Sequence, residues 1–475
     1  MRKRLGRREA LLLFIGLANL ALAWPAKKAL AALAIDPFLC LAGIQACLCA
    51  AGAALVWKGK TTRAAFSIVV GIGVLLRLGL IWEEPRISDD VYRYIWDGRV
   101  QAAGINPYRY IPADPHLTFL RDDAIYPHIN RRDYAPTIYP PFTQMFFLAV
   151  TRVSESIVWF KTVLLCLEAL TIWLLARLLV SFNLPRERVL IYAWNPLVIW
   201  EFSSGHVDVL MTALVLLALL ARRQRRDTLT GIVLGCAVLV KFFPLVLFPA
   251  LYRRWDWKMP LAAAATICLG YLPYFWGAGM RVFGFLSGYA KEEEMGNGRF
   301  FLLLLARYLT GGKEIPATAY LVFCFVALLL LAGCAILRWN DSARGFIASA
   351  GCLGTASLVF LSPQYPWYWM WLTPLLVFLP RPALWPFFYL SCAALLQYGD
   401  WFNDWRWFGF GINPFLARHI LQFVPAALMG TALYLLSRRG AATLLSPVAP
   451  VTVAPRVSPL RRSSVSLGSR LWRRE

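Results

Sequence analysis

Charged side chains are scarce in this sequence of 475 residues. They make up 16% of the chain, about one position in six, whereas a soluble protein carries roughly one in four. Hydrophobic residues reach 59%, and the mean hydropathy is +0.56. A water-soluble globular protein is therefore excluded.

Acidic residues are the scarcer of the two charged classes. Asp and Glu number 26 against 49 Lys and Arg, which gives a net charge of +23. In a soluble chain this excess would suggest nucleic acid as the partner. Here the basic clusters stand between long apolar runs, a pattern that orients multispanning proteins in a bilayer. The sequence therefore predicts one polytopic, all-α membrane domain.

Several common kinds of site are also missing from the sequence. It contains no Walker motif, no glycine-rich dinucleotide fingerprint, and no soluble stretch long enough to hold a nucleotide sugar. The ten cysteines all fall inside apolar runs. That distribution argues against a disulfide framework and predicts packed core cysteines, Cys47 and Cys49 included.

Transmembrane helices of about 20 apolar residues fit along nearly the whole chain. The predicted single spans are 10–26, 38–57, 65–82, 157–180, 188–204, 208–221, 260–277, 317–338, 345–362, 367–379, 383–398 and 415–437. Basic residues flank the run 228–251 on both sides, which predicts a hairpin of two short helices broken at Lys241 to Pro244, with Lys241 at its tip. The run 140–153 is too short to cross alone and is interpreted as a juxtamembrane or re-entrant helix. The total is about 13–14 crossings with both ends cytoplasmic.

The amino-acid composition divides the chain into two predicted regions. Residues 1–440 form the predicted membrane domain, and its large first extracytoplasmic loop is 83–140. Residues 441–475 are rich in Ser, Pro and Arg, which predicts a disordered basic cytoplasmic tail. The basic N-terminus followed by an apolar run indicates a signal anchor, with a cleaved signal peptide as the alternative.

The loop 83–140 holds nine of the 26 acidic residues and opens with SDDVYRYIWDG. Ser88 predicts a helix N-cap, and Gly104 predicts the end of that helix. Asp89 and Asp90 would occupy the first turn, where the helix dipole favours negative charge.

Two interpretations of this acidic pair stay open. One is a solvated helix with N-terminal acids and an ion-pair ladder through Arg93. The other is a functional site, because Asp89 and Asp90 directly follow a predicted span and so lie at the membrane surface. Paired carboxylates there could serve as a general base or hold a divalent cation.

Other candidate residues fall at the predicted outer ends of spans. These are His206, Asp208, Lys241, Arg299, Tyr365, Trp367 and Tyr368. An ionisable group close to the bilayer is a functional hypothesis by default, although a structural hydrogen bond is the alternative for His206 and Asp208. Lys241 should meet an anionic partner, and a simple pair with Asp208 is the alternative.

Five motifs, in this order, carry a resemblance to a known superfamily: SDDVYRYIWDGRVQAAGINPYRY, IYPPFTQMFF, WNPLVIWEFSSGHVD, LVKFFP and SPQYPWYWMWL. Together they resemble the GT-C superfamily of polytopic glycosyltransferases. The similarity is greatest to bacterial polyprenol-phosphate-dependent mannosyltransferases, and more distant to glycosyltransferase family 87 and to the first mannosyltransferase of GPI-anchor synthesis. It covers about residues 65–380.

The resemblance implies an inverting enzyme of the bacterial inner (cytoplasmic) membrane, with its active site on the extracytoplasmic side. It would move a sugar, mannose by family analogy, from a polyprenyl-phosphate donor to a lipid-linked or glycan acceptor. The catalytic base carries over onto Asp89, with Asp90 assisting, and Lys241 would meet the donor phosphate. No cofactor is expected, although a divalent cation at the acidic pair fits nearly as well.

Substrate contacts are expected from the remaining candidates by position alone. These are Arg93, His206, Asp208, Arg299, Tyr365, Trp367 and Tyr368. Inverting transfer needs a base for the acceptor hydroxyl and cations for the leaving phosphate, which these residue types supply. Two other functions stay open: a transporter or flippase of a lipid-linked saccharide, and a glycan ligase or polymerase.

Overall fold

The computed structural model describes residues 5–57, 62–399 and 412–444, and the regular elements in these ranges are all helical. The predicted all-α fold is therefore confirmed. In the first half of the chain the α-helices are α1 (Arg7–Ala31), α2 (Ile35–Trp57), α3 (Arg63–Leu78), α4 (Asp90–Ala102), α5 (Pro141–Thr151), α6 (Ile157–Ser181), α7 (Leu190–Ala193), α8 (Pro196–Ser203), α9 (Asp208–Arg223) and α10 (Asp227–Val238).

The second half continues this helical architecture. Its α-helices are α11 (Phe248–Leu251), α12 (Lys258–Ala278), α13 (Leu286–Glu292), α14 (Phe301–Leu309), α15 (Ala317–Leu337), α16 (Ala348–Leu361), α17 (Arg381–Ala393) and α18 (Pro414–Leu444). Short 3-10 or π segments lie between them: η1 (Pro115–Leu120), η2 (Tyr126–His128), η3 (Arg186–Val189), η4 (Phe243–Leu247), η5 (Gly279–Phe283), η6 (Met295–Asn297), η7 (Ala343–Ile347), η8 (Pro366–Phe378) and η9 (Ala394–Tyr398).

Six helical segments of the described chain are long and apolar enough to cross a membrane. They are Arg7–Ala31, Ile35–Trp57, Ile157–Ser181, Lys258–Glu292, Ala317–Leu337 and Pro414–Ser437. Their apolar side chains face outward in large part, as lipid contact requires; α15 exposes a row that includes Val322, Phe325 and Leu329. The chain is thus a multi-pass membrane protein.

The other predicted spans are shorter or broken helices. The predicted span 188–204 is interrupted at Asn195 and Pro196, and 367–379 forms the 3-10 segment η8, which contains Pro374. Proline removes a backbone donor and disrupts the helical ladder. Since α8 and η8 are buried throughout, neighbouring elements rather than lipid cover them. The count of 13–14 crossings stays a prediction.

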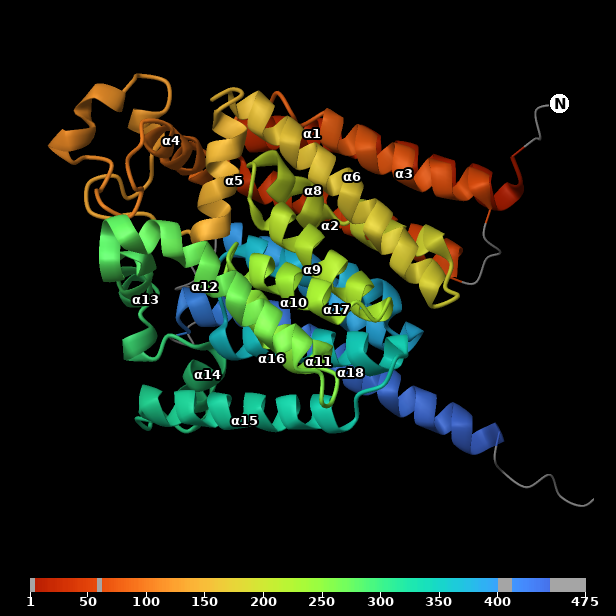
Figure 1. Ribbon diagram of the computed structural model, residues 1–475. Coiled ribbons are helices and arrows are strands. Elements are labelled where there is room, and N and C mark those ends of the chain that lie inside the picture. Colours follow the sequence, from red (N-terminus) through yellow and green to blue (C-terminus); the bar gives the residue numbers. More distant parts are fainter. Residues whose placement is uncertain (1–4, 58–61, 400–411, 445–475) are drawn as a thin grey trace, which may run out of the picture.

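The long polar loop lies at one end of the bundle (Figure 1). Helix α4 and the loop segments around it gather there together with α13, whereas the start of α1 and the end of α18 lie at the opposite end. The two described ends of the membrane domain therefore share one side, and the loop 83–140 occupies the other. The prediction likewise places both chain ends on one side of the membrane and the loop 83–140 on the other.

The hairpin predicted for residues 228–251 is present. Helix α10 ends at Val238, and the chain turns through Lys241 into η4 and α11. The carbonyl of Val240 accepts a hydrogen bond of 2.9 Å from the Thr143 hydroxyl on α5. The short helix α5 thus fixes the turn that carries Lys241.

One prediction is wrong in detail. Six of the ten cysteines, Cys47 among them, lie exposed on helix surfaces rather than packed in the core, because the outer face of a membrane helix is itself apolar. Helix α18 runs to Leu444, beyond the predicted start of the tail at 441. The rest of that predicted tail lies outside the described residues.

Candidate active site

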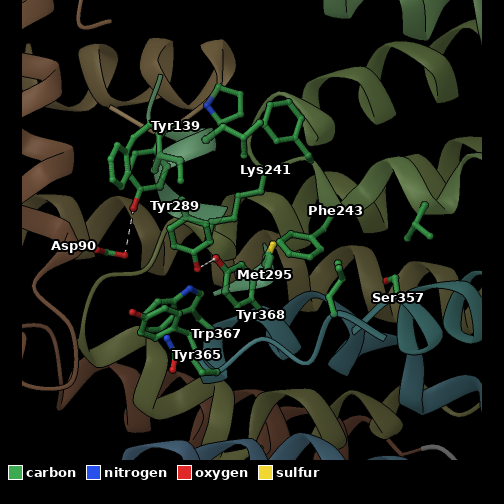
Figure 2. A pocket seen from close by; sticks show the side chains of 18 of the residues that line it. Asp90, Tyr139, Lys241, Phe243, Tyr289, Met295, Ser357, Tyr365, Trp367 and Tyr368 are labelled. Carbon is green, nitrogen blue, oxygen red and sulfur yellow. Dashed lines mark hydrogen bonds between the residues drawn. The ribbon is translucent and has the colours of Figure 1, made fainter. Parts of the chain in front are cut away.

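A cavity of about 1060 Å³ lies beneath the polar loop. Its polar part is lined by the start of α4, the loop residues Asn130 and Arg131, Lys241, and tyrosines from several elements. Its apolar part continues between η4, α15 and α16, along side chains such as Phe243 and Leu329. Figure 2 shows this polarity, with Asp90 and Tyr139 on one side and Phe243 and Ser357 on the other.

Helix α4 brings the acidic pair to the cavity. Asp89 is the N-cap and Asp90 the first helical residue, one position later than predicted, while the Ser88 hydroxyl accepts a hydrogen bond of 3.3 Å from the Asp90 amide. Gly104 has φ +77°, which ends the helix as predicted. The positive end of the helix dipole therefore faces both carboxylates.

A single amide links the two carboxylates. The Asn130 side chain donates to Asp89 Oδ1 at 2.8 Å and to Asp90 Oδ1 at 2.7 Å. Asp90 Oδ2 accepts a further hydrogen bond of 3.2 Å from the Tyr139 hydroxyl (Figure 2). Both oxygens of Asp90 are thus held in place.

Asp89 is the more accessible member of the pair. Its residue is exposed, whereas the Asp90 side chain keeps 15% of its accessible surface. Desolvation at the cavity mouth raises the pKa of Asp89; the neighbouring Asp90 charge adds to that rise, and the Asn130 hydrogen bond opposes it. A raised pKa makes a carboxylate a better proton acceptor once it is ionised.

Arg93 lies at the cavity wall, but its guanidinium group is hydrogen-bonded to other groups of the protein. Its Nε donates to Asp97 Oδ1 at 2.8 Å, and its Nη1 donates to the Ala135 carbonyl at 3.2 Å. Asp97 is buried and also accepts from Gln144 at 3.0 Å. The predicted ion-pair ladder therefore runs through Asp97 in the interior and not on a solvated face.

Lys241 reaches the cavity from the hairpin turn. Its Nζ lies 2.6 Å from Asp208 Oδ2 and 5.0 Å from the centre of the Tyr368 ring. The pair with Asp208, considered above as the alternative, is therefore present. An ammonium group carries three donors, and the 12% of the Lys241 side chain that stays accessible faces a cavity it lines.

The three aromatic candidates form one wall of the cavity. Tyr365 stacks on Trp367 with ring centres 4.4 Å apart, and Tyr368 shares a 2.8 Å hydroxyl contact with Tyr289 (Figure 2). These rings come from the start of η8 and from α13, which the sequence separates by about 75 residues.

Three predicted residues lie behind the cavity wall and not on it. Asp208 and His206 are fully buried, and each touches a residue that lines the cavity: Lys241 for Asp208, and Trp367 for His206, with ring centres 4.2 Å apart. Arg299 donates to Gln364 at 3.1 Å, which in turn lines the cavity.

His206 stands between two carboxylates. Its Nδ1 lies 3.9 Å from Asp90 Oδ2, and its Nε2 lies 3.4 Å from Oε2 of the fully buried Glu201. Burial lowers the pKa of His206 to about 3; the Asp90 charge opposes that shift and the Lys241 charge adds to it. The imidazole is therefore neutral at physiological pH.

Residues 9–256 match a family model described as the N-terminal domain of α-(1→6)-mannopyranosyltransferases, the MptA/B family. The match spans slightly more than half of the 475-residue chain and contains the acidic pair, His206 and Lys241. The chain belongs to this family. Its members are mannosyltransferases that use polyprenyl-phosphate-mannose donors, so the predicted enzyme class is confirmed. No curated protein and no solved structure gives a match.

The cavity and the layer behind it also contain residues that the sequence did not reveal. Asn130, Tyr139 and Glu201 contact the acidic pair or His206, and Tyr398 donates to Glu201 Oε1 at 2.9 Å. Glu201 carried a usable signal, because it is an acidic residue inside an apolar run. The others are uncharged, and nothing in their local sequence distinguishes them.

Metal ligation has limited support at this site. Across the described residues, no group of three or more His, Cys, Asp or Glu side chains is arranged to hold a metal ion. The Asn130 amide nitrogen, a donor to both carboxylates, occupies the bridging position between Asp89 and Asp90. A cation at the pair would have to displace it.

Proposed function

We propose that this mannosyltransferase transfers mannose, with inversion, from polyprenyl-phosphate mannose to a glycan or lipid-linked acceptor at the cavity beneath the polar loop. One observation carries the proposal: a carboxylate pair and a lysine from distant segments line the same cavity, whose other part is apolar. The polar part suits a sugar phosphate, and the apolar part suits an isoprenoid chain.

The lipid chain of the donor fits the apolar part of the cavity. Leu245 and Val246 of η4, Phe325 and Leu329 of α15, and Leu353 of α16 line it. Phe325 and Leu329 also belong to the exposed outer face of α15, so the cavity wall continues into the surface that lipid would cover. A donor could therefore enter sideways from the bilayer.

The donor phosphate would meet Lys241. An ammonium group with two donors to spare can bind phosphate oxygens while it still neutralises Asp208. A phosphate monoester is already a competent leaving group, so cationic stabilisation replaces a general acid. Arg131, which also lines the cavity, pairs with Glu292 at 2.7 Å and would add positive potential.

Asp89 would act as the general base, and Asp90 would assist. The acceptor hydroxyl oxygen attacks the anomeric carbon of mannose while the bond from that carbon to the phosphate oxygen breaks. Asp89 takes the hydroxyl proton, and polyprenyl phosphate leaves. An accessible carboxylate with a raised pKa suits this step; desolvation raises the pKa of Asp89 most, and the Asp90 charge adds to it.

A donor panel tests the function. The purified protein, reconstituted in liposomes, is incubated with radiolabelled polyprenyl-phosphate mannose, polyprenyl-phosphate glucose and GDP-mannose. Label should leave polyprenyl-phosphate mannose and appear in a glycan acceptor, and GDP-mannose should be inert. Turnover of GDP-mannose alone, or no turnover of any lipid-linked sugar, would rule the proposal out.

Accessibility labelling tests the proposed extracytoplasmic side of a bacterial inner membrane. Asp123→Cys places a thiol on the exposed polar loop, and Arg254→Cys places one on the connection between α11 and α12. A membrane-impermeant maleimide should label only Asp123→Cys in spheroplasts and only Arg254→Cys in inverted vesicles. The reverse pattern would refute the assigned orientation.

A further inference from the structure

Several buried polar atoms cluster directly behind the acidic pair. They are Oε2 of Glu201, both ring nitrogens of His206 and Oδ1 of Asp208, and none has a hydrogen-bond partner among the described residues. Glu201, His206 and Asp208 are each fully buried. Unpartnered buried polar atoms are rare in folded proteins, and such a group next to a proposed base calls for a chemical reason.

Glu201 has no cation to neutralise it. Among the described residues its ion-pair contact is His206, and the nearby Lys241 is paired with Asp208. An unpaired carboxylate in the interior is costly, so Glu201 keeps its proton. Its Oε1 accepts from the Tyr398 hydroxyl at 2.9 Å, which leaves the proton on Oε2, the atom that faces His206.

A protonated Glu201 fixes the tautomer of His206. A neutral imidazole has one donor nitrogen and one acceptor nitrogen. If Nε2 accepts from Glu201, the ring proton is on Nδ1, and Nδ1 is the atom that faces Asp90 at 3.9 Å. The Trp367 ring, stacked on the imidazole at 4.2 Å, restrains its plane.

We propose that His206 is a positioning residue for the acidic pair. The Tyr398 hydroxyl donates to Glu201, and the N–H and O–H groups beyond it then point in the same direction, from Glu201 toward His206 at 3.4 Å and from His206 toward Asp90 at 3.9 Å. The Nδ1–H dipole then faces the carboxylate that Asn130 and Tyr139 hold, and it favours that orientation of Asp90 electrostatically. This inference rests on the proposed function, because it assigns a purpose to the pair that holds the base, but it does not depend on which aspartate takes the proton.

The charged and titratable groups near His206 come from several elements. They are Asp90 on α4, Glu201 on α8, Asp208 on α9, Lys241 after α10 and Tyr398 on η9. Asp208 and Lys241 neutralise each other. Asp90 and Glu201 are therefore the two carboxyl groups that His206 stands between.

Replacing His206 by Ala should change the pH profile. The substitution removes the N–H dipole that faces the acidic pair, so the pH below which the pair loses activity should rise. Since mannosyl transfer requires both carboxylates in the ionised form, acidification should then abolish it at a higher pH in the variant than in the wild type. We expect the acidic limb of kcat/KM to move up by about one pH unit and kcat to fall about ten- to hundredfold, with donor KM unchanged.

Two variants at Glu201 decide its protonation state. Glu201→Gln keeps a neutral donor facing Nε2 and should retain activity within about threefold, whereas Glu201→Leu should resemble His206→Ala. If Glu201→Gln is as inactive as Glu201→Leu, Glu201 works as a carboxylate and the proposal is overturned. Because Gln is nearly isosteric with Glu, this test does not depend on a cavity variant folding.

Controls separate positioning from a merely structural role. His206→Asn leaves an amide donor near the position of Nδ1, so its acidic limb should lie between those of the wild type and His206→Ala. His419 is another fully buried histidine that does not line the cavity, and His419→Asn should leave the acidic limb unmoved. If the acidic limb of the kcat/KM profile is unchanged in His206→Ala, the inference is overturned, but the result of the donor panel still stands. If the donor panel fails, the proposed function itself is rejected.

Discussion

Two buried glutamates in this protein each accept a hydrogen bond from a tyrosine hydroxyl, but they differ in whether a cation pairs with the carboxylate. Glu168 on α6 and Glu201 on α8 are both fully buried, and each accepts from a tyrosine hydroxyl: Tyr192 at 2.7 Å for Glu168 and Tyr398 at 2.9 Å for Glu201. Glu168 also pairs with Arg77 at 2.9 Å. Among the described residues no such cation pairs with Glu201, which faces His206 instead.

The difference separates a structural network from the one that we propose to be functional. Arg77 also donates to the carbonyls of Gly73 at 2.9 Å and Ala193 at 2.8 Å, so one ion pair ties α3, α6 and α7 together. At Glu201 an oxygen and its imidazole neighbour are left without hydrogen bonds, beside the cavity. The Glu168–Arg77 ion pair holds helices together, whereas the atoms without hydrogen-bond partners at Glu201 and His206 lie next to the proposed active site.

Arg77→Met should give the largest effect on stability. The substitution leaves Glu168 buried without its cation, which costs about 3–5 kcal/mol. Thermal unfolding of the purified protein in detergent should show a marked fall in apparent Tm, and the fraction that stays folded should keep its donor KM. An unchanged Tm, or a specific loss of donor affinity, would break the contrast between the two glutamates.

Lys241→Gln should raise the donor KM by about tenfold. Asp208 resembles Glu168 in having a cation, but that cation lines the cavity, so removing it should weaken donor binding in addition to lowering stability. Initial rates at varied polyprenyl-phosphate mannose measure the change, and the acceptor KM provides the internal control. An equal rise in both constants would argue against a phosphate role for Lys241.

Matched tyrosine variants should give the smallest effects and the cleanest comparison. Tyr192→Phe removes the hydroxyl from Glu168 and should lower stability by about 1 kcal/mol with no change in kcat. Tyr398→Phe removes the hydroxyl from Glu201 and should lower kcat about two- to fivefold with little change in Tm. Identical behaviour of the two variants would mean that the glutamates do not differ in role.

Local patterns in the sequence predict much of this fold. The turn at Lys241, the short helix 141–151 and the helix that carries Asp89 and Asp90 all depend on proline, glycine or charge at particular positions. The number of bilayer crossings is less predictable, because an apolar segment covered by protein looks the same in sequence as one covered by lipid. The continuously buried α8 and η8 are examples.

The candidate site is less predictable than the fold. Charged residues such as Lys241 and Asp208 attract notice in an apolar chain, and they do meet. Asn130 and Tyr398 act through contacts with residues 40 and 197 positions away, and no local pattern encodes such contacts. Whether His206 contacts substrate or stands behind the wall also depends on packing, and its spacing along the chain carries no information on this.

Sugar transfer by aspartate variants tests the central claim most directly. Asp89→Asn, Asp90→Asn and the matched loop variant Asp123→Asn are compared in liposomes loaded with radiolabelled polyprenyl-phosphate mannose. The account predicts that Asp89→Asn lowers transfer about a thousandfold while the donor still binds, that Asp90→Asn also impairs transfer, and that Asp123→Asn matches the wild type. Full transfer by Asp89→Asn and Asp90→Asn would contradict the assignment of this cavity as the active site.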